Sequence, residues 1–297
     1  MSLPNLKDWK EASDILHQVV SLFGPIHKAL QPHRDNYLHL PMEVRPKGLE
    51  SQTLPGGGKI HLNLEAGSLT LVKGGGSSES FDFKNHTQRS LFEGLLEALR
   101  DEGFGEELGV GKGDSLATGN GDSLAAALVG KLVSEEKAGR FLTLAGVTRD
   151  EPLQVDLETA SAYADVQYSV FTALARFRAR VGGAMTPIIV WPEHFDLSTL
   201  WFPPTNPGMD DHGPHISIGF APFTPGQYED PYLYAYAYPY PDSFDPPALP
   251  SSAIWHNEGW QGAVVGYHEI ARQKDHELFV EDVTLEVFRR LSAVLER

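Results

Sequence analysis

Five tyrosines alternate with small or apolar residues between Tyr232 and Tyr240. In an extended strand, alternate side chains point to the same face, so the five rings share one face. Such a face has two interpretations: a cross-strand aromatic ladder that stabilises a sheet, or one wall of a binding pocket. Aromatic rings bordered by carboxylates suit cations, sugars or flat polar rings.

The tyrosines belong to a long span that contains no Lys or Arg, residues 181–271. The same span contains ten carboxylates and 16 of the chain's 30 aromatic residues. A pocket built there lacks the basic side chains that usually bind phosphate or carboxylate groups. We therefore expect a small neutral or cationic ligand, bound by Trp191, Asp196, His215, Tyr234, Tyr236 and Tyr238.

Two alternatives assign these residues other roles. In the first, His215 and Asp196 are the acid–base pair of a hydrolase or lyase, assisted by a metal ion. The weak metal candidates are Asp211, His212 and His215, whose types suit a divalent ion, although a solvated loop also explains the cluster. In the second, the protein is structural and its tyrosine face is buried against another chain, with no small-molecule site.

Hydrophobic periodicity predicts four helices that would support this region. The first begins near Asn5 and is divided at Gly24-Pro25, and the second begins near Thr87 and ends near Gly103. The third covers about 158–181, and the fourth begins near Asp275.

Alternating apolar residues predict strands between the helices. Before residue 103 these are 38–44, a hairpin over 60–64 and 69–71, and 80–83. After residue 151 they are 187–191, 195–202, 215–221, 232–240 and 262–268.

This order of elements predicts an α+β fold made of two related α-β-β-β-β-α units, an internal duplication. Short connections between consecutive strands favour antiparallel sheets with helices packed on one face. The expected domains are residues 1–103 and 152–297, joined by a glycine-rich, flexible linker at 104–151 that includes a short helix near Ser134–Lys137.

The linker contains two motifs that resemble enzyme motifs, but the residues around them do not fit those enzymes. Gly-Asp-Ser-Leu occurs at Gly113–Leu116 and Gly121–Leu124, but without a preceding buried strand and in mid-chain, unlike lipolytic hydrolases. Gly109–Gly113 lacks the first glycine and the hydroxyl residue of a phosphate-binding loop. The chain therefore has no nucleotide or phosphate cofactor motif, and its cofactors are unknown.

Composition limits the partners of this 297-residue, acidic, aromatic-rich chain. A net charge of −16 disfavours nucleic acid and anionic membranes. The absence of cysteine excludes disulfides and thiolate chemistry, and it is typical of a cytoplasmic protein. We find neither a membrane helix nor a signal-peptide core in the sequence, so we expect a soluble protein. The sequence leaves its oligomeric state open.

Several segments resemble a bacterial family that is known only as a domain of unknown function. The most specific are Phe195-Asp196-Leu197, His215 with Gly219-Phe220, and Tyr234–Pro239. The resemblance extends over nearly the whole chain, but Ile216 stands where the family has Glu. It implies the fold and the region of interest without implying an activity.

Overall fold

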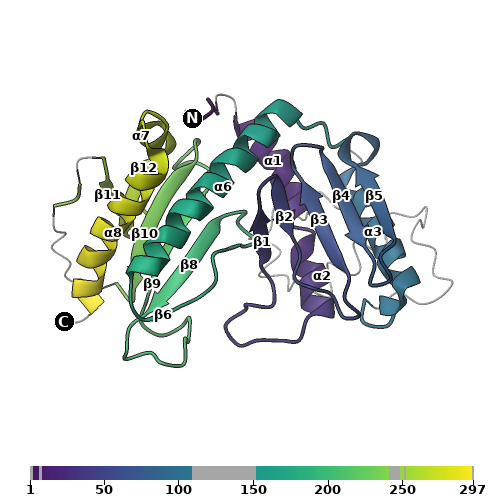
Figure 1. Ribbon diagram of the computed structural model, residues 1–297, viewed down its shortest axis with the longest axis horizontal. Coiled ribbons are helices and arrows are strands. Elements are labelled where there is room, and N and C mark those ends of the chain that lie inside the picture. Colours follow the sequence, from purple (N-terminus) through teal and green to yellow (C-terminus); the bar gives the residue numbers. More distant parts are fainter. Residues whose placement is uncertain (1–2, 7–8, 109–151, 241–247, 251, 296–297) are drawn as a thin grey trace. The chain divides into compact units, whose positions relative to one another are not determined.

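The computed structural model describes residues 3–6, 9–108, 152–240, 248–250 and 252–295, and Figure 1 shows its helices and strands. The Gly-Asp-Ser-Leu repeats, the Gly109–Gly113 loop, the short helix expected near Ser134 and nearly all of the expected linker lie outside these residues. The fold is α+β, and every strand pair recorded within a unit is antiparallel.

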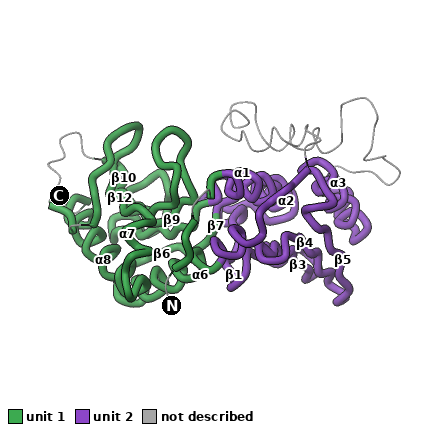
Figure 2. The backbone as a smooth tube through the Cα atoms, turned by 90° about the horizontal axis from the view of Figure 1, so that it is seen from above, with its two compact units in different colours: residues 1–10, 165–190, 196–297 green, residues 11–164, 191–195 purple. Residues whose placement is uncertain are grey.

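The described chain forms two compact units, which Figure 2 distinguishes by colour. Unit 1 contains residues 1–10, 165–190 and 196–297, and unit 2 contains residues 11–164 and 191–195. The segment 191–195 therefore groups with the N-terminal half, unlike in the expected division at residues 103 and 152. The expected internal duplication stays a prediction.

The described part of unit 2 contains five strands in consecutive order: β1 (Met42–Arg45), β2 (Gly48–Glu50), β3 (Lys59–Asn63), β4 (Ser68–Val72) and β5 (Ser78–Asp82). The helices of its described residues are α1 (Trp9–Val20), α2 (Phe23–Leu30), η1 (Phe83–Asn85), α3 (Gln88–Leu99) and η2 (Arg100–Phe104). The predicted hairpin is confirmed as β3 and β4. The first predicted helix is divided, but the break is at Ser21-Leu22, between α1 and α2, and Gly24-Pro25 lie in the first turn of α2. Thr87 begins α3 with a capping box, because its hydroxyl accepts the N–H of Ser90.

In unit 1 the structure describes seven strands: β6 (Ala184–Met185), β7 (Ile189–Val190), β8 (Leu197–Phe202), β9 (His215–Ala221), β10 (Tyr232–Tyr238), β11 (Ile254–His256) and β12 (Gly262–Gly266). Their order is β11-β12-β10-β9-β8-β7, with β6 paired to β8. The helices are α6 (Leu157–Arg180), most of which belongs to this unit, α7 (Tyr267–Ala271) and α8 (His276–Leu295).

The two long helices of unit 1 lie on the same face of its strands (Figure 1). Phe177 of α6 contacts Phe288 of α8, with ring centroids 5.5 Å apart. Thr284 and Val287 of α8 lie against Leu233 and Ala235 of β10. Since side chains alternate along a strand, the tyrosines of β10 project from the opposite face.

The sequence patterns misplace some elements of both units. Four strands were expected in each half, whereas the described residues form five and seven, because β2, β6 and β11 are too short to give a clear alternation. The strand expected over 262–268 ends at Gly266, and Tyr267 begins α7. Among the described residues, we find no helix with the length and apolar character that crossing a bilayer requires.

Candidate functional site

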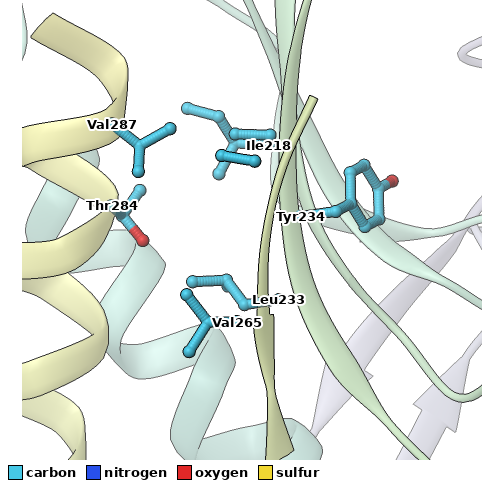
Figure 3. A pocket seen from close by; sticks show the side chains of 8 residues that line it. Ile218, Leu233, Tyr234, Val265, Thr284 and Val287 are labelled. Atoms are coloured by element: carbon cyan, nitrogen blue, oxygen red, sulfur yellow. The ribbon is translucent and has the colours of Figure 1, made fainter. Parts of the chain in front are cut away.

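The tyrosine face, as we call it, is formed by Tyr232, Tyr234, Tyr236 and Tyr238 of β10 together with Tyr228, His256 and Trp260 from neighbouring segments. Figure 3 shows the ring of Tyr234 on one side of the strands, and Leu233, Thr284 and Val287 on the other. The helix side encloses a cavity of about 10 Å³, which is large enough for no more than a water molecule. This cavity leaves no room for a larger ligand behind Leu233 and Ala235, so we look for such a ligand of β10 on the tyrosine face.

Each tyrosine of β10 lies opposite a different residue of β9. Tyr238 is paired with His215, Tyr236 with Ser217, and Tyr234 with Gly219. Opposed residues of adjacent strands share a face, so their side chains determine how far each ring can tilt across the sheet.

Gly219 allows Tyr234 to lie across β9. A Cβ atom at position 219 would be 2.5 Å from the Tyr234 hydroxyl oxygen, so only glycine accommodates the ring there. The phenol reaches the next strand and donates a hydrogen bond to Oδ2 of Asp196, at the start of β8. The buried Asp196, which is 8% exposed, thus fixes Tyr234 in place.

Gly262 of β12 likewise leaves space for the ring of Trp260. A Cβ atom at this position of β12 would be 2.5 Å from the Trp260 ring and 3.0 Å from Cβ of Tyr236. Trp260 lies edge-on to Tyr234 and Tyr236, with centroid distances of 6.3 and 6.2 Å. Two glycines on flanking strands therefore let the rings of β10 and the Trp260 loop pack together.

Tyr228 and His256 extend the ring cluster toward β11. His256 lies 4.4 Å from Trp260, centroid to centroid. Its Nε2 donates to the carbonyl of Glu258 at 2.8 Å, and its Nδ1 is hydrogen-bonded to the Tyr228 hydroxyl, also at 2.8 Å. These bonds fix the orientation of both rings.

Three phenols of the tyrosine face, those of Tyr232, Tyr234 and Tyr236, have raised pKa values and are hydrogen-bond donors at neutral pH. Burial raises the pKa of Tyr232 to about 12. Burial, followed by the nearby Asp196 charge, raises the pKa of Tyr234 well above its usual value. Burial also raises the pKa of Tyr236, although a hydrogen bond with Ser217 opposes this shift. The face therefore presents neutral rings and protonated hydroxyls.

His215 belongs to the same face at its other end. Its ring stacks on Tyr238 at a centroid distance of 5.3 Å, and its Nδ1 donates to the carbonyl of Gly213 at 2.9 Å. Burial lowers the pKa of His215. The neutral ring therefore has its acceptor at Nε2.

The strand register separates the two residues of the expected acid–base pair. Leu197 is paired with Phe220, so Asp196 lies beside the Ala221 end of β9, whereas His215 is its first residue. Six residues of strand span about 20 Å. This distance contradicts a catalytic His215–Asp196 pair, because direct proton transfer needs hydrogen-bond distance or one bridging water.

Two of the three expected metal candidates, Asp211 and His212, belong to a small cluster in the loop before β9, which includes Asp210 and does not include His215. Ligand atoms of Asp210, Asp211 and His212 lie within 4.8 Å of one another. Asn206 organises this loop by donating to the carbonyl of Asp210 at 2.7 Å, and Asp210 in turn accepts the His212 N–H at 2.9 Å. Because these turn contacts explain the arrangement, we assign no metal to it.

Trp191, the remaining predicted binding residue, belongs to unit 2. Its carbonyl accepts the N–H groups of His194 and Phe195, at 3.3 and 2.8 Å, in a tight turn. Phe195 is fully buried with φ 56° and stacks on His17 of α1. A role for Trp191 in ligand binding stays a prediction.

Sequence reasoning missed several members of the tyrosine face. Tyr228, His256 and Trp260 come from three separate segments, and the sequence pattern does not reveal that they converge. The one available signal was the pair of glycines in predicted strands, Gly219 and Gly262, because strand glycines often mark a close approach.

Comparisons with known proteins identify a family and little more. No curated protein and no solved structure matches the chain. A family model described as a family of unknown function (DUF5996) matches residues 2–110 and 148–292, which confirms the predicted resemblance over nearly the full length. The chain therefore belongs to the family of unknown function DUF5996.

Proposed function

We propose that the tyrosine face binds a small neutral or cationic ligand with a flat ring or a quaternary ammonium group. The observation that supports this proposal is that the rings of the tyrosine face contact one another and are still partly exposed to solvent. Tyr234, Tyr236 and Trp260 are half-buried, and Tyr238 is 45% exposed. Partly exposed aromatic rings held in fixed orientations offer stacking surfaces at a low cost in conformational entropy.

The charges around the face favour a cation over an anion. No Lys or Arg occurs between residues 181 and 271. The carboxylate of Asp196 acts on Tyr234 and Tyr236, and that of Glu258 acts on Tyr228. A cation over these rings gains from the ring quadrupoles and from both carboxylates.

Asp196 supports the site without touching the ligand. It is buried, and it accepts the hydroxyl of Tyr234. We therefore treat Asp196 as a positioning residue. Tyr236, Tyr238 and Trp260 are the ligand-contacting residues in this proposal, and His215 supports Tyr238 by stacking.

The proposal is tested by isothermal titration calorimetry with three probes: benzyltrimethylammonium, adenosine and methyl glucoside. We expect at least one of them to bind, and benzyl phosphate to bind more weakly than benzyltrimethylammonium. The variant Tyr236→Leu should weaken binding about tenfold, since base or ring stacking on one aromatic residue contributes about 1–3 kcal/mol.

Tyr168→Leu is the matched control, because Tyr168 is exposed on α6 and stacks only on its neighbour Phe171 among the described residues. It should leave binding unchanged. The proposal is wrong if none of the three probes binds, or if Tyr168→Leu weakens binding as much as Tyr236→Leu. A dimer that dissociates in Tyr238→Ala would favour the structural alternative in place of ligand binding.

A further inference from the structure

A second hollow lies on the helix side of unit 1, between α8, β8 and the end of α6. It has a volume of about 260 Å³ and is lined by Arg180, Val181, Gly182, Trp201, Leu285, Phe288, Arg289 and Ser292. The four lining residues of α8 follow the spacing i, i+3, i+4 and i+7, so they form one stripe along the helix. We call this hollow the arginine pocket.

The floor of the arginine pocket consists of two aromatic rings, which are held by contacts with each other and with the backbone. Trp201 and Phe288 meet edge to face with centroids 5.1 Å apart, and both are buried. The indole N–H of Trp201 donates to the carbonyl of Gly182 at 2.8 Å. Gly183 has φ +112°, and a Cβ atom there would be 2.5 Å from Nε1 of Trp201. Glycine at this position therefore leaves space for the indole beside residues 182 and 183.

Among the described residues, the rim of the arginine pocket carries two guanidinium groups and no carboxylate. Nη1 of Arg180 contacts Glu281 at 2.6 Å, and Nη1 of Arg289 contacts Glu286 at 2.7 Å. These carboxylates come from α8 but do not line the hollow. In the described part of the chain, the recorded contacts of both arginines use Nη1, which leaves Nε and Nη2 as further donors.

We propose that the arginine pocket binds a small carboxylate whose apolar body is a flat ring. The ring would pack on Trp201 and Phe288, and the carboxylate would accept hydrogen bonds from Arg180 and Arg289. Guanidinium groups bind carboxylates with directional, charge-assisted hydrogen bonds, and an apolar floor under such a rim is typical of small-molecule sites. This site has the opposite charge preference to the tyrosine face and does not depend on it.

The test compares benzoate with benzamide, which has the same ring and similar size but no charge. We expect benzoate to bind the full chain at millimolar concentration and benzamide to bind at least about tenfold more weakly, because only the anion gains both guanidinium contacts. Calorimetry or ligand-observed NMR measures both affinities. Failure of benzoate to bind in this range, or equal binding of the two probes, would overturn the proposal.

Three substitutions locate the binding site. Arg289→Gln and Arg180→Gln should each weaken benzoate binding about tenfold. Arg176→Gln is the matched control: Arg176 also joins α6 to α8, through Glu277 at 2.9 Å, but does not line the pocket. The control should leave benzoate binding unchanged, and a loss as large as that of Arg289→Gln would contradict the assignment.

Tyr236→Leu separates this site from the tyrosine face. It should leave benzoate binding unchanged, whatever its effect on the cationic probe. Thermal unfolding of each variant checks that it folds, and Phe288→Leu gives a second, uncharged variant that keeps an apolar floor and should weaken benzoate less than Arg289→Gln does.

Discussion

The phenol of Tyr234 and the carboxylate of Asp196 are hydrogen-bonded across a strand that carries glycine between them. The two residues are 38 positions apart and lie on β10 and at the start of β8, with Gly219 of β9 in the middle. Through this hydrogen bond, the buried Asp196 fixes the position of Tyr234 within the tyrosine face. The proposed binding role of the tyrosine face depends on this contact.

Removing the phenol of Tyr234 should destabilise the protein. Tyr234→Phe leaves the buried Asp196 without this donor, and hydrogen bonds to charged groups contribute about 1.5–3 kcal/mol. We expect the free energy of unfolding, measured by urea denaturation, to fall by that amount. Tyr238→Phe is the control, because no hydrogen bond to the Tyr238 hydroxyl is recorded among the described residues. It should change stability by less than about 0.5 kcal/mol, and equal losses in both variants would contradict this role of Asp196.

Gly219→Ala should disturb both neighbours of β9. The new Cβ would lie 2.5 Å from the Tyr234 hydroxyl and 2.5 Å from the carbonyl of Leu197, so the ring or the strand must move. Overpacking of this kind costs about 1–3 kcal/mol, measurable by thermal or urea unfolding. Gly208→Ala is the control, because no described atom would lie within 4 Å of its new methyl group. An unchanged stability of Gly219→Ala would show that Tyr234 does not need this space.

Stability should fall in mild acid because of a buried histidine in unit 2. His27 is fully buried with its Nδ1 2.6 Å from the carbonyl of Leu40, and burial lowers its pKa from 6.5 to about 4. Between these values the unfolded chain binds the proton and the folded chain does not, so stability is lost as the pH falls from 6.5 to 4. Linkage gives a loss of about 2 kcal/mol between pH 7.5 and 5 from this residue alone.

The measurement is the unfolding free energy at the two pH values. His27→Gln removes the titrating group and should reduce the loss by about 2 kcal/mol. His212→Gln, at an exposed loop position, is the control and should leave the loss as in the parent protein. If His27→Gln keeps the full pH dependence, another group is responsible.

A substitution at the small cavity behind β10 should stabilise the protein. Thr284 lines the cavity, and within the described residues its buried hydroxyl has no hydrogen-bond partner (Figure 3). An unsatisfied buried hydroxyl is costly, so Thr284→Val should raise the unfolding free energy by about 1 kcal/mol. Thr172→Val should give no such gain, because the Thr172 hydroxyl donates to the carbonyl of Tyr168 at 2.9 Å. A loss of stability in Thr284→Val would indicate a bound water that the hydroxyl holds.

The strands that carry long alternating runs were predictable from sequence, and their neighbours were less so. The tyrosine alternation predicted β10 and the shared face of four of the five rings, but the strand ends at Tyr238 and excludes Tyr240. The range of β9 matches the expected 215–221. Short strands such as β11 escaped notice because three residues cannot show a period. Tyr267 was expected to extend β12, but the chain turns at Gly266 into α7.

The composition of the candidate site was easier to predict than its geometry. Charge and aromatic content identified the region, because these are properties of the sequence itself. The separation of His215 from Asp196 depends on strand register, which no local pattern of either strand specifies. The contact of Tyr234 with Asp196 depends on the same register and on one glycine, and so it became apparent only in the folded chain.

The most direct measurement is NMR of the protein with isotope-labelled tyrosine rings, titrated with benzyltrimethylammonium. The account predicts that the ring signals of Tyr236 and Tyr238 shift in a saturable manner, whereas that of Tyr168 on α6 stays in place. If all tyrosine signals stay in place, or Tyr168 shifts as much as Tyr236, the tyrosine face does not bind this class of ligand.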